Sequence, residues 1–383
     1  MKKFLVIFGT RPEAIKMAPV VKSLEHYMEL NPGRLSVKVC ITAQHRELLD
    51  QVLEVFNIVP DYDLNIMQDN QDLFDLSSRI LLKVRGVLDD FEPDLVFVHG
   101  DTSTAFISSL ATFYKKIKIA HVEAGLRTND IYSPWPEEAN RQLTSKLADF
   151  HFAPTDNSKT NLVNENISES SIHITGNTVI DALLMVRQKI YNSVNLQQSI
   201  EEGIKLDFKI KGSKYILVTG HRRENFGESF VNICKALIEI AKSNPAFYII
   251  YPMHMNPNVV KPVTALLGKI KNICLISPLD YLSFVYLMDN SFLILTDSGG
   301  IQEEAPSLGI PVLVMRENTE RPEAIKYGTV KLVGTSTSRI TAEVQELIDD
   351  ADKYKLMSET INPYGDGKAS EKILEVLIKN EQL

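Results

Sequence analysis

The sequence contains few cysteines and no long hydrophobic segment. Its 383 residues include three cysteines, Cys40, Cys234 and Cys274, which lie far apart among apolar residues. This spacing indicates buried free thiols in a reducing cytosol and gives no sign of a disulfide scaffold. No apolar run reaches the roughly 20 residues that a helix needs to span a bilayer. The sequence therefore predicts a cytoplasmic protein that is neither exported nor embedded in a membrane.

The amino-terminal residues resemble the beginning of a signal peptide only briefly. The apolar run that ends at Phe8 is followed at once by the polar sequence Gly9-Thr10-Arg11-Pro12-Glu13. This segment is therefore expected to be the first strand of the fold and not an export signal.

Basic tracts and the common cofactor fingerprints are also missing. The formal net charge is −8, and no basic run could follow a phosphate backbone, so nucleic acid is not an expected partner. Neither the Gly-x-Gly-x-x-Gly dinucleotide fingerprint nor a Walker P-loop occurs, which removes the usual support for a nicotinamide or ATP cofactor. We expect no cofactor.

The length and composition are those of a globular protein with two domains. A chain of 383 residues exceeds the size at which a single core keeps growing, and its apolar content of 44% is ordinary. Short apolar runs alternate with amphipathic stretches of helical length, and the absence of polar alternation predicts parallel strands buried on both faces. We expect an α/β fold with two Rossmann-like, doubly wound domains. The predicted strands are Phe4–Phe8, Val37–Ile41, Leu95–Val98, Ile117–Val122, Phe150–Ala153, Tyr215–Thr219, Phe247–Tyr251, Ile273–Ile276, Phe292–Thr296, Val312–Val314 and Val330–Val333.

The domain boundary is expected near a polar stretch in the middle of the chain. Residues 192–213 could form a linker or a peripheral helix, and we place the first domain at 1–190 and the second at 191–366. Residues 367–383 are expected to form a terminal helix after a turn rich in Gly and Pro.

The end of the first predicted strand has the features of an anion site. Thr10 can cap a helix, Pro12 suits its first turn, and Arg11 and Lys16 place two cations near its start. The alternative is a helical ion pair between Glu13 and Lys16 with Arg11 in solvent.

Carboxylates follow two successive strands of the first domain. Asp101 and Glu123 occupy these positions, and both should face one crevice because ligands bind at the carboxyl ends of parallel strands. With Glu137, they are the groups that proton abstraction and return at a sugar carbon would require. The alternative is a metal site built from Asp101, Glu123, His99 and His121.

Two segments of the second domain could bind a diphosphate and a ribose. His221 and Arg222 follow a strand and a glycine, although a lone histidine is often structural. The sequence Ser298-Gly299-Gly300 offers bare backbone amides at a helix start, and Glu304 could accept hydrogen bonds from ribose hydroxyls. The alternative, an ordinary Ser-capped helix, does not explain two glycines followed by paired glutamates.

Together these motifs resemble the non-hydrolysing bacterial UDP-N-acetylglucosamine 2-epimerases over essentially the whole chain. The segments that carry the resemblance are Gly9–Lys16, Gly100–Thr104, His121–Arg127, Pro136–Glu138, Gly220–Asn225 and Asp297–Glu304. The resemblance implies a glycosyltransferase-B type fold with a UDP-sugar in the interdomain cleft and the terminal helix returning to the first domain. It also implies a homodimer that works without metal or nicotinamide.

The resemblance assigns roles to individual residues. It implies that Asp101, Glu123 and Glu137 are the acid/base carboxylates and that His221 assists catalysis at the departing diphosphate. UDP elimination would give a bound 2-acetamidoglucal, to which UDP adds again after protonation from the opposite face. The residues expected to hold UDP are Arg11, Lys16, His221, Arg222, Ser298, Gly299, Gly300, Glu304 and Arg321.

The resemblance further implies an activating site for a second UDP-N-acetylglucosamine. Its expected residues are Gln44, His45 and Gln71. The surrounding sequence departs from the family pattern at Ala43 and Asn70.

Three other functions remain open on the sequence. An epimerase of a related UDP-2-acetamido sugar would differ in a few pocket residues. A UDP-sugar glycosyltransferase would share the fold, and Asp61-Tyr62-Asp63 matches its metal-binding pattern, but we interpret this segment as a surface turn after Val59-Pro60. A UDP-sugar sensor would leave the three carboxylates without a task.

Overall fold

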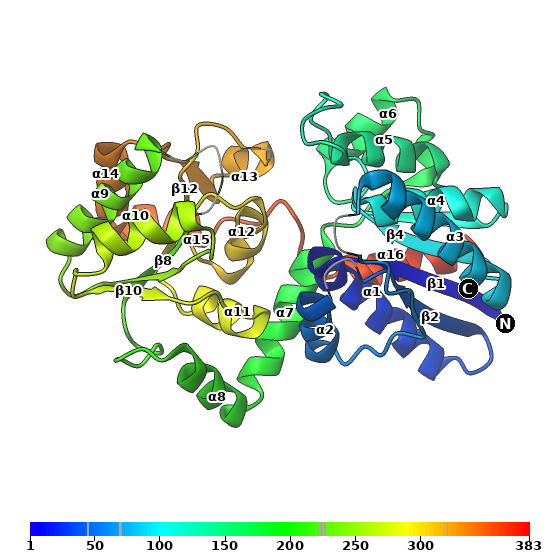
Figure 1. The fold of residues 1–383 in the computed structure, drawn as a ribbon, viewed down its shortest axis with the longest axis horizontal. Helices are drawn as coiled ribbons and strands as arrows, with labels where there is room; N and C mark the ends of the chain where they lie inside the picture. Colours follow the sequence, from blue (N-terminus) through cyan, green and yellow to red (C-terminus); the bar gives the residue numbers. More distant parts are fainter. Residues whose placement is uncertain (44–45, 69–70, 221, 223–224, 226, 320) are drawn as a thin grey trace. The chain divides into compact units, whose positions relative to one another are not determined.

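The computed structural model describes the chain except residues 44–45, 69–70, 221, 223–224, 226 and 320. The described residues form two compact units, Met1–Leu184 with Tyr364–Leu383, and Met185–Pro363. Each unit is built on one parallel sheet with flanking helices (Figure 1). The predicted α/β class is confirmed. No helix in the described part of the chain is both long and apolar enough to cross a membrane.

The first unit contains a seven-stranded sheet whose strand order is β3-β2-β1-β4-β5-β6-β7. The order reverses between β1 and β4, which is the switch point at which open α/β sheets bind ligands. The strands are β1 (Lys2–Phe8), β2 (Leu35–Ile41), β3 (Tyr62–Asp63), β4 (Leu95–His99), β5 (Lys118–Val122), β6 (Phe150–Ala153) and β7 (Ile172–Ile174).

The central strands are buried on both faces, as their unbroken apolar runs predict. The side chains of Phe4–Phe8 in β1 and Leu95–Val98 in β4 are fully buried, and Val6 pairs with both Val39 and Phe97. No residue of these runs faces water, so both strands are tightly packed. The loops that follow them are therefore attached to a rigid part of the sheet.

Two groups of helices enclose this sheet. One contains α1 (Arg11–Leu30), α2 (Arg46–Val55) and α16 (Ala369–Lys379), with α1 packed against both others. The other contains α3 (Leu73–Phe91), α4 (Ser103–Tyr114) and α5 (Glu137–Leu147), packed in succession. Right-handed crossovers on either side of the switch point place the groups on opposite faces. The remaining helices are α6 (Asp156–Asn164) and α7 (Thr178–Tyr191).

The second unit repeats the same plan with a six-stranded sheet of order β10-β9-β8-β11-β12-β13. Its switch point lies between β8 and β11. The strands are β8 (Tyr215–Thr219), β9 (Tyr248–Pro252), β10 (Ile273–Ile276), β11 (Leu293–Thr296), β12 (Val312–Val314) and β13 (Val330–Leu332). The helices are α8 (Val194–Ile204), α9 (Glu228–Ser243), α10 (Pro257–Leu267), α11 (Tyr281–Asp289), α12 (Gly299–Glu304), α13 (Pro322–Tyr327), α14 (Thr337–Asp349) and α15 (Ala351–Ser358).

The structure differs from the sequence-based expectations in two places, and it decides between two alternatives in a third. The division between the units falls inside α7, after Leu184, whereas we expected it after residue 190. The polar stretch 192–213 contains the helix α8, which is the helical alternative of the two that we expected there. Tyr62 and Asp63 form a short edge strand beside β2, so the surface-turn interpretation was wrong for these two residues.

Candidate active site

The start of α1 is fixed by a buried carboxylate. Thr10 caps the helix, and Glu13 Oε2 accepts hydrogen bonds from the backbone N–H groups of Gly9 (3.0 Å) and Thr10 (2.8 Å). The Thr102 hydroxyl, which precedes α4, donates to Glu13 Oε1 at 2.7 Å. This capping box ties the loops after β1 and β4 together at the switch point. Burial raises the pKa of Glu13, although these hydrogen bonds oppose the shift.

Lys16 contacts a carboxylate from a different strand. Its ammonium forms an ion pair with Glu123 Oε2, and both side chains are largely buried. The alternative helical pair between Glu13 and Lys16 is therefore wrong, because Glu13 caps the helix instead. The proposed contact of Lys16 with UDP is untested and remains a prediction.

Glu123 follows β5 in an uncommon backbone conformation. Its φ of 61° lies in the left-handed region, which costs a residue other than glycine about 1–2 kcal/mol. Its Oε2 accepts a hydrogen bond from Asn177 Nδ2 at 2.8 Å and lies 3.8 Å from His99 Nε2. Backbone strain of this kind is typical of functional positions that the surrounding structure holds in place.

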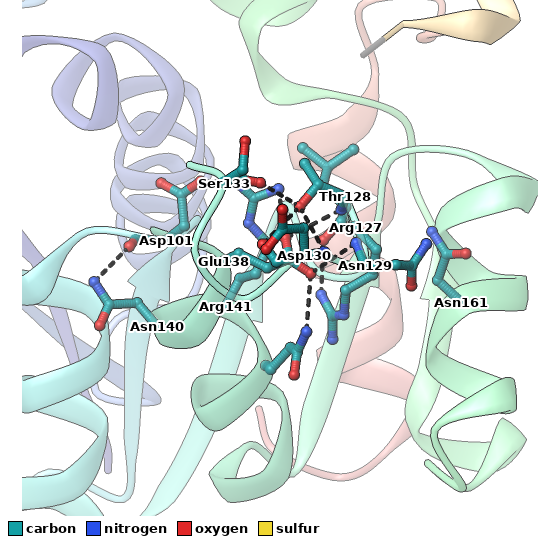
Figure 2. A network of polar contacts seen from close by, with 12 residues as sticks. Asp101, Arg127, Thr128, Asn129, Asp130, Ser133, Glu138, Asn140, Arg141 and Asn161 are labelled. Carbon is teal, nitrogen blue, oxygen red and sulfur yellow. Dashed lines mark hydrogen bonds and ion pairs between the residues drawn. The ribbon is translucent and has the colours of Figure 1, made fainter. Parts of the chain in front are cut away.

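Asp101 follows β4 and faces a positive and two negative groups. Its Oδ2 forms an ion pair with Arg141 Nη2 at 2.6 Å, and its carbonyl accepts from Asn140 Nδ2 at 2.9 Å (Figure 2). Partial burial raises the pKa of Asp101; Glu123 and Glu137 add to this effect, whereas Arg141 opposes it. The three predicted carboxylates are therefore close enough to interact electrostatically.

Glu137 begins α5 directly after Pro136 and is partly exposed. Within the described residues it forms no hydrogen bond or ion pair, and its electrostatic effect on Asp101 is its only identified interaction. Its carboxylate is thus available to a ligand.

The neighbouring Glu138 has a structural task. It is fully buried and accepts a hydrogen bond from the Thr128 backbone N–H at 3.1 Å (Figure 2). It also accepts a hydrogen bond from Gln142 Nε2 at 2.9 Å. Burial alone would raise the pKa of Glu138, but these hydrogen bonds and the nearby Arg141 lower it. Glu138 therefore anchors the loop that leads from β5 to α5.

The two histidines of this edge are buried and uncharged. Burial lowers the pKa of His99 to about 4 and that of His121 to about 3. His121 Nε2 is hydrogen-bonded to the carbonyl of Gly100 at 2.8 Å. Across the described ranges, no three His, Cys, Asp or Glu side chains gather as metal ligands. The geometry therefore does not support the alternative metal site built from Asp101, Glu123 and these two histidines.

In the second unit, Ser298 precedes α12 without capping it. Its hydroxyl makes no cap hydrogen bond, and its backbone N–H donates to Thr296 Oγ1 at 2.9 Å. The alternative of an ordinary Ser-capped helix is therefore wrong.

Two guanidinium groups lie beside the first residue of α12. A Cβ placed on Gly299 would be 3.8 Å from Arg222 Nη2 and 4.0 Å from Arg321 Nη2. Arg321 also forms an ion pair with the buried Glu303. Cations at a helix start with bare backbone amides can hold a phosphate group.

The carboxylate of Glu304 lies at the same helix. It is 3.5 Å from the hydroxyl of Tyr281 and would be 3.5 Å from a Cβ on Gly300. His221, the other expected residue of this site, lies outside the described residues. Its catalytic role and its UDP-binding role therefore both remain predictions.

Sequence reasoning missed several polar residues that support these sites. The buried Asp297 accepts hydrogen bonds from the Arg222 backbone N–H (2.9 Å) and Asn225 Nδ2 (3.2 Å), and thereby holds these two residues. Arg141 lies three residues after Glu138 and pairs with it at 3.4 Å, but no local spacing reveals its contact with Asp101. Asn177 follows β7, a three-residue strand that the apolar pattern did not reveal.

Of the residues expected at the activating site, only Gln71 can be described. Gln71 Oε1 accepts a hydrogen bond from Arg79 Nη2 at 2.6 Å. Gln44 and His45 lie outside the described residues, as does Asn70.

Comparison with known proteins shows the family. A family model described as UDP-N-acetylglucosamine 2-epimerase matches residues 28–378. The chain belongs to this family. The UDP-N-acetylglucosamine 2-epimerase of Campylobacter jejuni is 58% identical over 382 residues, which cover 100% of this chain and 98% of that protein. That of Escherichia coli K12 is 57% identical and covers 99% of both chains.

Solved structures of UDP-N-acetylglucosamine 2-epimerases share the fold. The Neisseria meningitidis enzyme, bound to UDP-GlcNAc, has a TM-score of 0.88 and 53% identity, with 99% of this chain and 100% of that chain covered. The Methanocaldococcus jannaschii enzyme, in complex with UDP-GlcNAc and UDP, has a TM-score of 0.79 and 34% identity, with 98% and 99% covered.

Proposed function

We propose that this chain interconverts UDP-N-acetylglucosamine and UDP-N-acetylmannosamine by reversible epimerisation at sugar carbon 2. Its membership of the 2-epimerase family supports this reaction. The observation that carries the proposal is that Asp101 and Glu123 follow the paired strands β4 and β5 at one edge of the sheet, with Glu137 near enough to raise the pKa of Asp101. Acid/base chemistry at a carbon atom requires such groups with different proton affinities.

The reaction needs the UDP group to leave before the configuration can change. The hydrogen on carbon 2 is not adjacent to a carbonyl, so its direct removal is unfavourable. One carboxylate takes this proton as the bond between carbon 1 and the diphosphate oxygen breaks, and UDP departs with the electron pair. A second carboxyl group then protonates carbon 2 of the 2-acetamidoglucal from the opposite face while UDP adds again at carbon 1. Asp101, Glu123 and Glu137 supply these proton donors and acceptors.

The departing diphosphate requires positive charge and hydrogen-bond donors. The guanidinium groups of Arg222 and Arg321 lie beside Gly299, and this arrangement supports a diphosphate site at the start of α12. In this proposal Ser298 and Gly300 contribute to the same site and Glu304 accepts from the ribose hydroxyls. Arg11, Lys16 and His221 complete the set of UDP-binding groups, and His221 also assists departure.

Incubation of the purified protein with UDP-N-acetylglucosamine in deuterated water tests the proposal. NMR should show UDP-N-acetylmannosamine with deuterium at carbon 2 of both epimers, because the bound glycal is reprotonated from exchangeable groups. Product without deuterium, together with retention of a carbon-2 label in a single turnover, would indicate a different mechanism. Absence of any epimer would contradict the function itself.

We further propose that the enzyme is a cytoplasmic homodimer activated by a second UDP-N-acetylglucosamine. The free thiols of Cys40, Cys234 and Cys274 are consistent with a reducing compartment. Sedimentation analysis tests the dimer. The rate of the reverse reaction tests the activator. A small added amount of UDP-N-acetylglucosamine should accelerate the conversion of UDP-N-acetylmannosamine.

A further inference from the structure

Asn177, a residue with no role assigned so far, is fixed at both ends of its side-chain amide. It lies directly before α7 and is almost completely buried. Its Oδ1 accepts a hydrogen bond from the Val179 backbone N–H at 3.0 Å, and its Nδ2 donates to Glu123 Oε2 at 2.8 Å. Because the N–H of Val179 needs an acceptor, the amide can have only one orientation, which directs its NH₂ group to the carboxylate.

The backbone around Asn177 is also held tightly. Its N–H donates to the carbonyl of Tyr364 at 2.7 Å, where the chain re-enters the first unit. Gly176 has a φ of 92°, and a Cβ on it would lie 3.2 Å from the Tyr364 carbonyl oxygen. A side chain at Gly176 would therefore be crowded as well as strained. The side-chain NH₂ group that faces Glu123 is therefore attached to a backbone with little conformational freedom.

Glu123 needs such support because of its own backbone. Its φ of 61° is uncommon for a residue with a side chain, so external contacts must hold it. Lys16 supplies charge to Oε2 from a long, flexible side chain. Asn177 has a short side chain held at both ends, and its hydrogen bond fixes the orientation of the carboxylate.

We propose that Asn177 is a positioning residue for Glu123 in the epimerisation, and this inference rests on the proposed function. It orients the carboxylate toward carbon 2 and stabilises its ionised form by donating a hydrogen bond. Asn177 itself exchanges no proton with the substrate.

The competing explanation is that Asn177 only caps α7, and two substitutions separate the explanations. Asp and Ser cap helices about as well as Asn, so both Asn177→Asp and Asn177→Ser should retain the acceptor for Val179. Asn177→Asp replaces the donor by an acceptor, and Asn177→Ser is too short to reach Glu123. A pure cap predicts turnover close to that of the wild type for both variants.

The positioning role predicts a fall of kcat on the order of 10²-fold in both variants, because small displacements of a reacting group cost about that much. The KM for UDP-N-acetylglucosamine should change much less. Turnover of Asn177→Asp should recover in part as the pH falls, because the new carboxyl group can donate once it is protonated. Asn177→Ser should show no such recovery.

A matched control lies one turn further along α7. Asp181 is buried and accepts from Ser370 N (2.7 Å) and Ser370 Oγ (2.8 Å), so it tethers α16 without contacting Glu123. Asp181→Asn should lower the Tm and leave the pH profile of kcat unchanged. Circular dichroism of each variant checks that it is folded.

Near-normal kcat in both Asn177 variants would overturn the positioning role, as would the same kinetic change in Asp181→Asn. These outcomes presuppose an active wild type. An inactive wild type would instead overturn the proposed function, and the positioning role with it. A low kcat in both Asn177 variants, with recovery at low pH only for Asn177→Asp, would support the inference.

Discussion

Arg141 Nη2 lies 2.6 Å from Asp101 Oδ2, so a guanidinium group from α5 balances the carboxylate that follows β4. Without this charge, partial burial and the two neighbouring glutamates would raise the pKa of Asp101 further. The pair sets how easily Asp101 gives up a proton.

We therefore expect Arg141→Ala to move the limb of the kcat pH profile that reports Asp101 to higher pH. The direction follows because removing a nearby positive charge favours the protonated carboxyl group. Arg141→Lys keeps the charge and should shift the limb less. Gln142→Ala is the control, because it removes a hydrogen bond to Glu138 without approaching Asp101. An unchanged profile in Arg141→Ala would show that another group controls that limb.

Each of the three carboxylates should be necessary for turnover but not for binding of UDP. Asp101→Asn, Glu123→Gln and Glu137→Gln are expected to lower kcat by about 10² or more, since acid/base groups contribute at least that much. Calorimetric titration with UDP should give affinities close to that of the wild type. Near-normal turnover in any two of the variants would refute the assignment.

The sequence predicted the central strands well because their apolar runs are long and unbroken. It missed β3 and β7, which contain two and three residues and include the polar Asp63 and His173. The same limit hid Asn177, since a residue at the end of an unrecognised strand receives no attention as a ligand-binding position. The sequence motifs identified Asp101 and Glu123, but not Arg141 and Asn177, which contact them.

Partners escape sequence reasoning because they are set by tertiary contacts. Lys16 and Glu13 are spaced as a helical pair, yet one contacts Glu123 and the other Thr102. No local rule distinguishes these outcomes, because each depends on which loops the sheet brings to the switch point.

Binding of UDP should depend on the two arginines beside Gly299. Arg222→Ala and Arg321→Ala are each expected to weaken UDP by about 10- to 100-fold, the usual effect of losing a hydrogen bond to a charged group. Glu304→Ala should weaken UDP but not pyrophosphate, because it is assigned to the ribose. Arg339→Ala is the matched control, since Arg339 is bonded to the carbonyl of Leu332 elsewhere in the second unit. An unchanged affinity for UDP in all three variants would show that the nucleotide binds elsewhere on the protein.

Glu13 should make stability depend on pH in a defined direction. Because burial raises its pKa in the folded protein, its contribution is fully present below about pH 4 and is lost as the pH rises through the raised pKa. Glu13→Gln can accept from Gly9 and Thr10 and donate to Thr102, so it should retain the capping box without this pH dependence. Thermal unfolding from pH 4.5 to 7.5 should thus show the Tm of the wild type falling relative to Glu13→Gln. Glu13→Ala loses the capping box and should be less stable than the wild type by about 2 kcal/mol at the acidic end of this range, with a smaller difference at higher pH.

The last prediction concerns retention of the reaction intermediate. If carbon 2 loses its hydrogen only when the anomeric bond breaks, the site must hold UDP and the glycal together until UDP adds again. Arg11 begins α1 at the switch point of the first sheet, next to the buried capping box. Its charge is suited to holding the departed diphosphate.

Arg11→Ala should therefore release free UDP and 2-acetamidoglucal during turnover, and the ratio of released UDP to epimer formed should rise above that of the wild type. NMR of the reaction mixture measures both species directly. Arg34→Ala provides the control, because Arg34 is exposed and precedes β2 at the amino end of the sheet, away from the switch point. A variant of Arg11 that turns over slowly but releases no more UDP per epimer than the wild type would show that Arg11 does not retain the intermediate. Equal release by Arg34→Ala would point to a general loss of surface charge, since only Arg11 lies where the diphosphate is expected to depart.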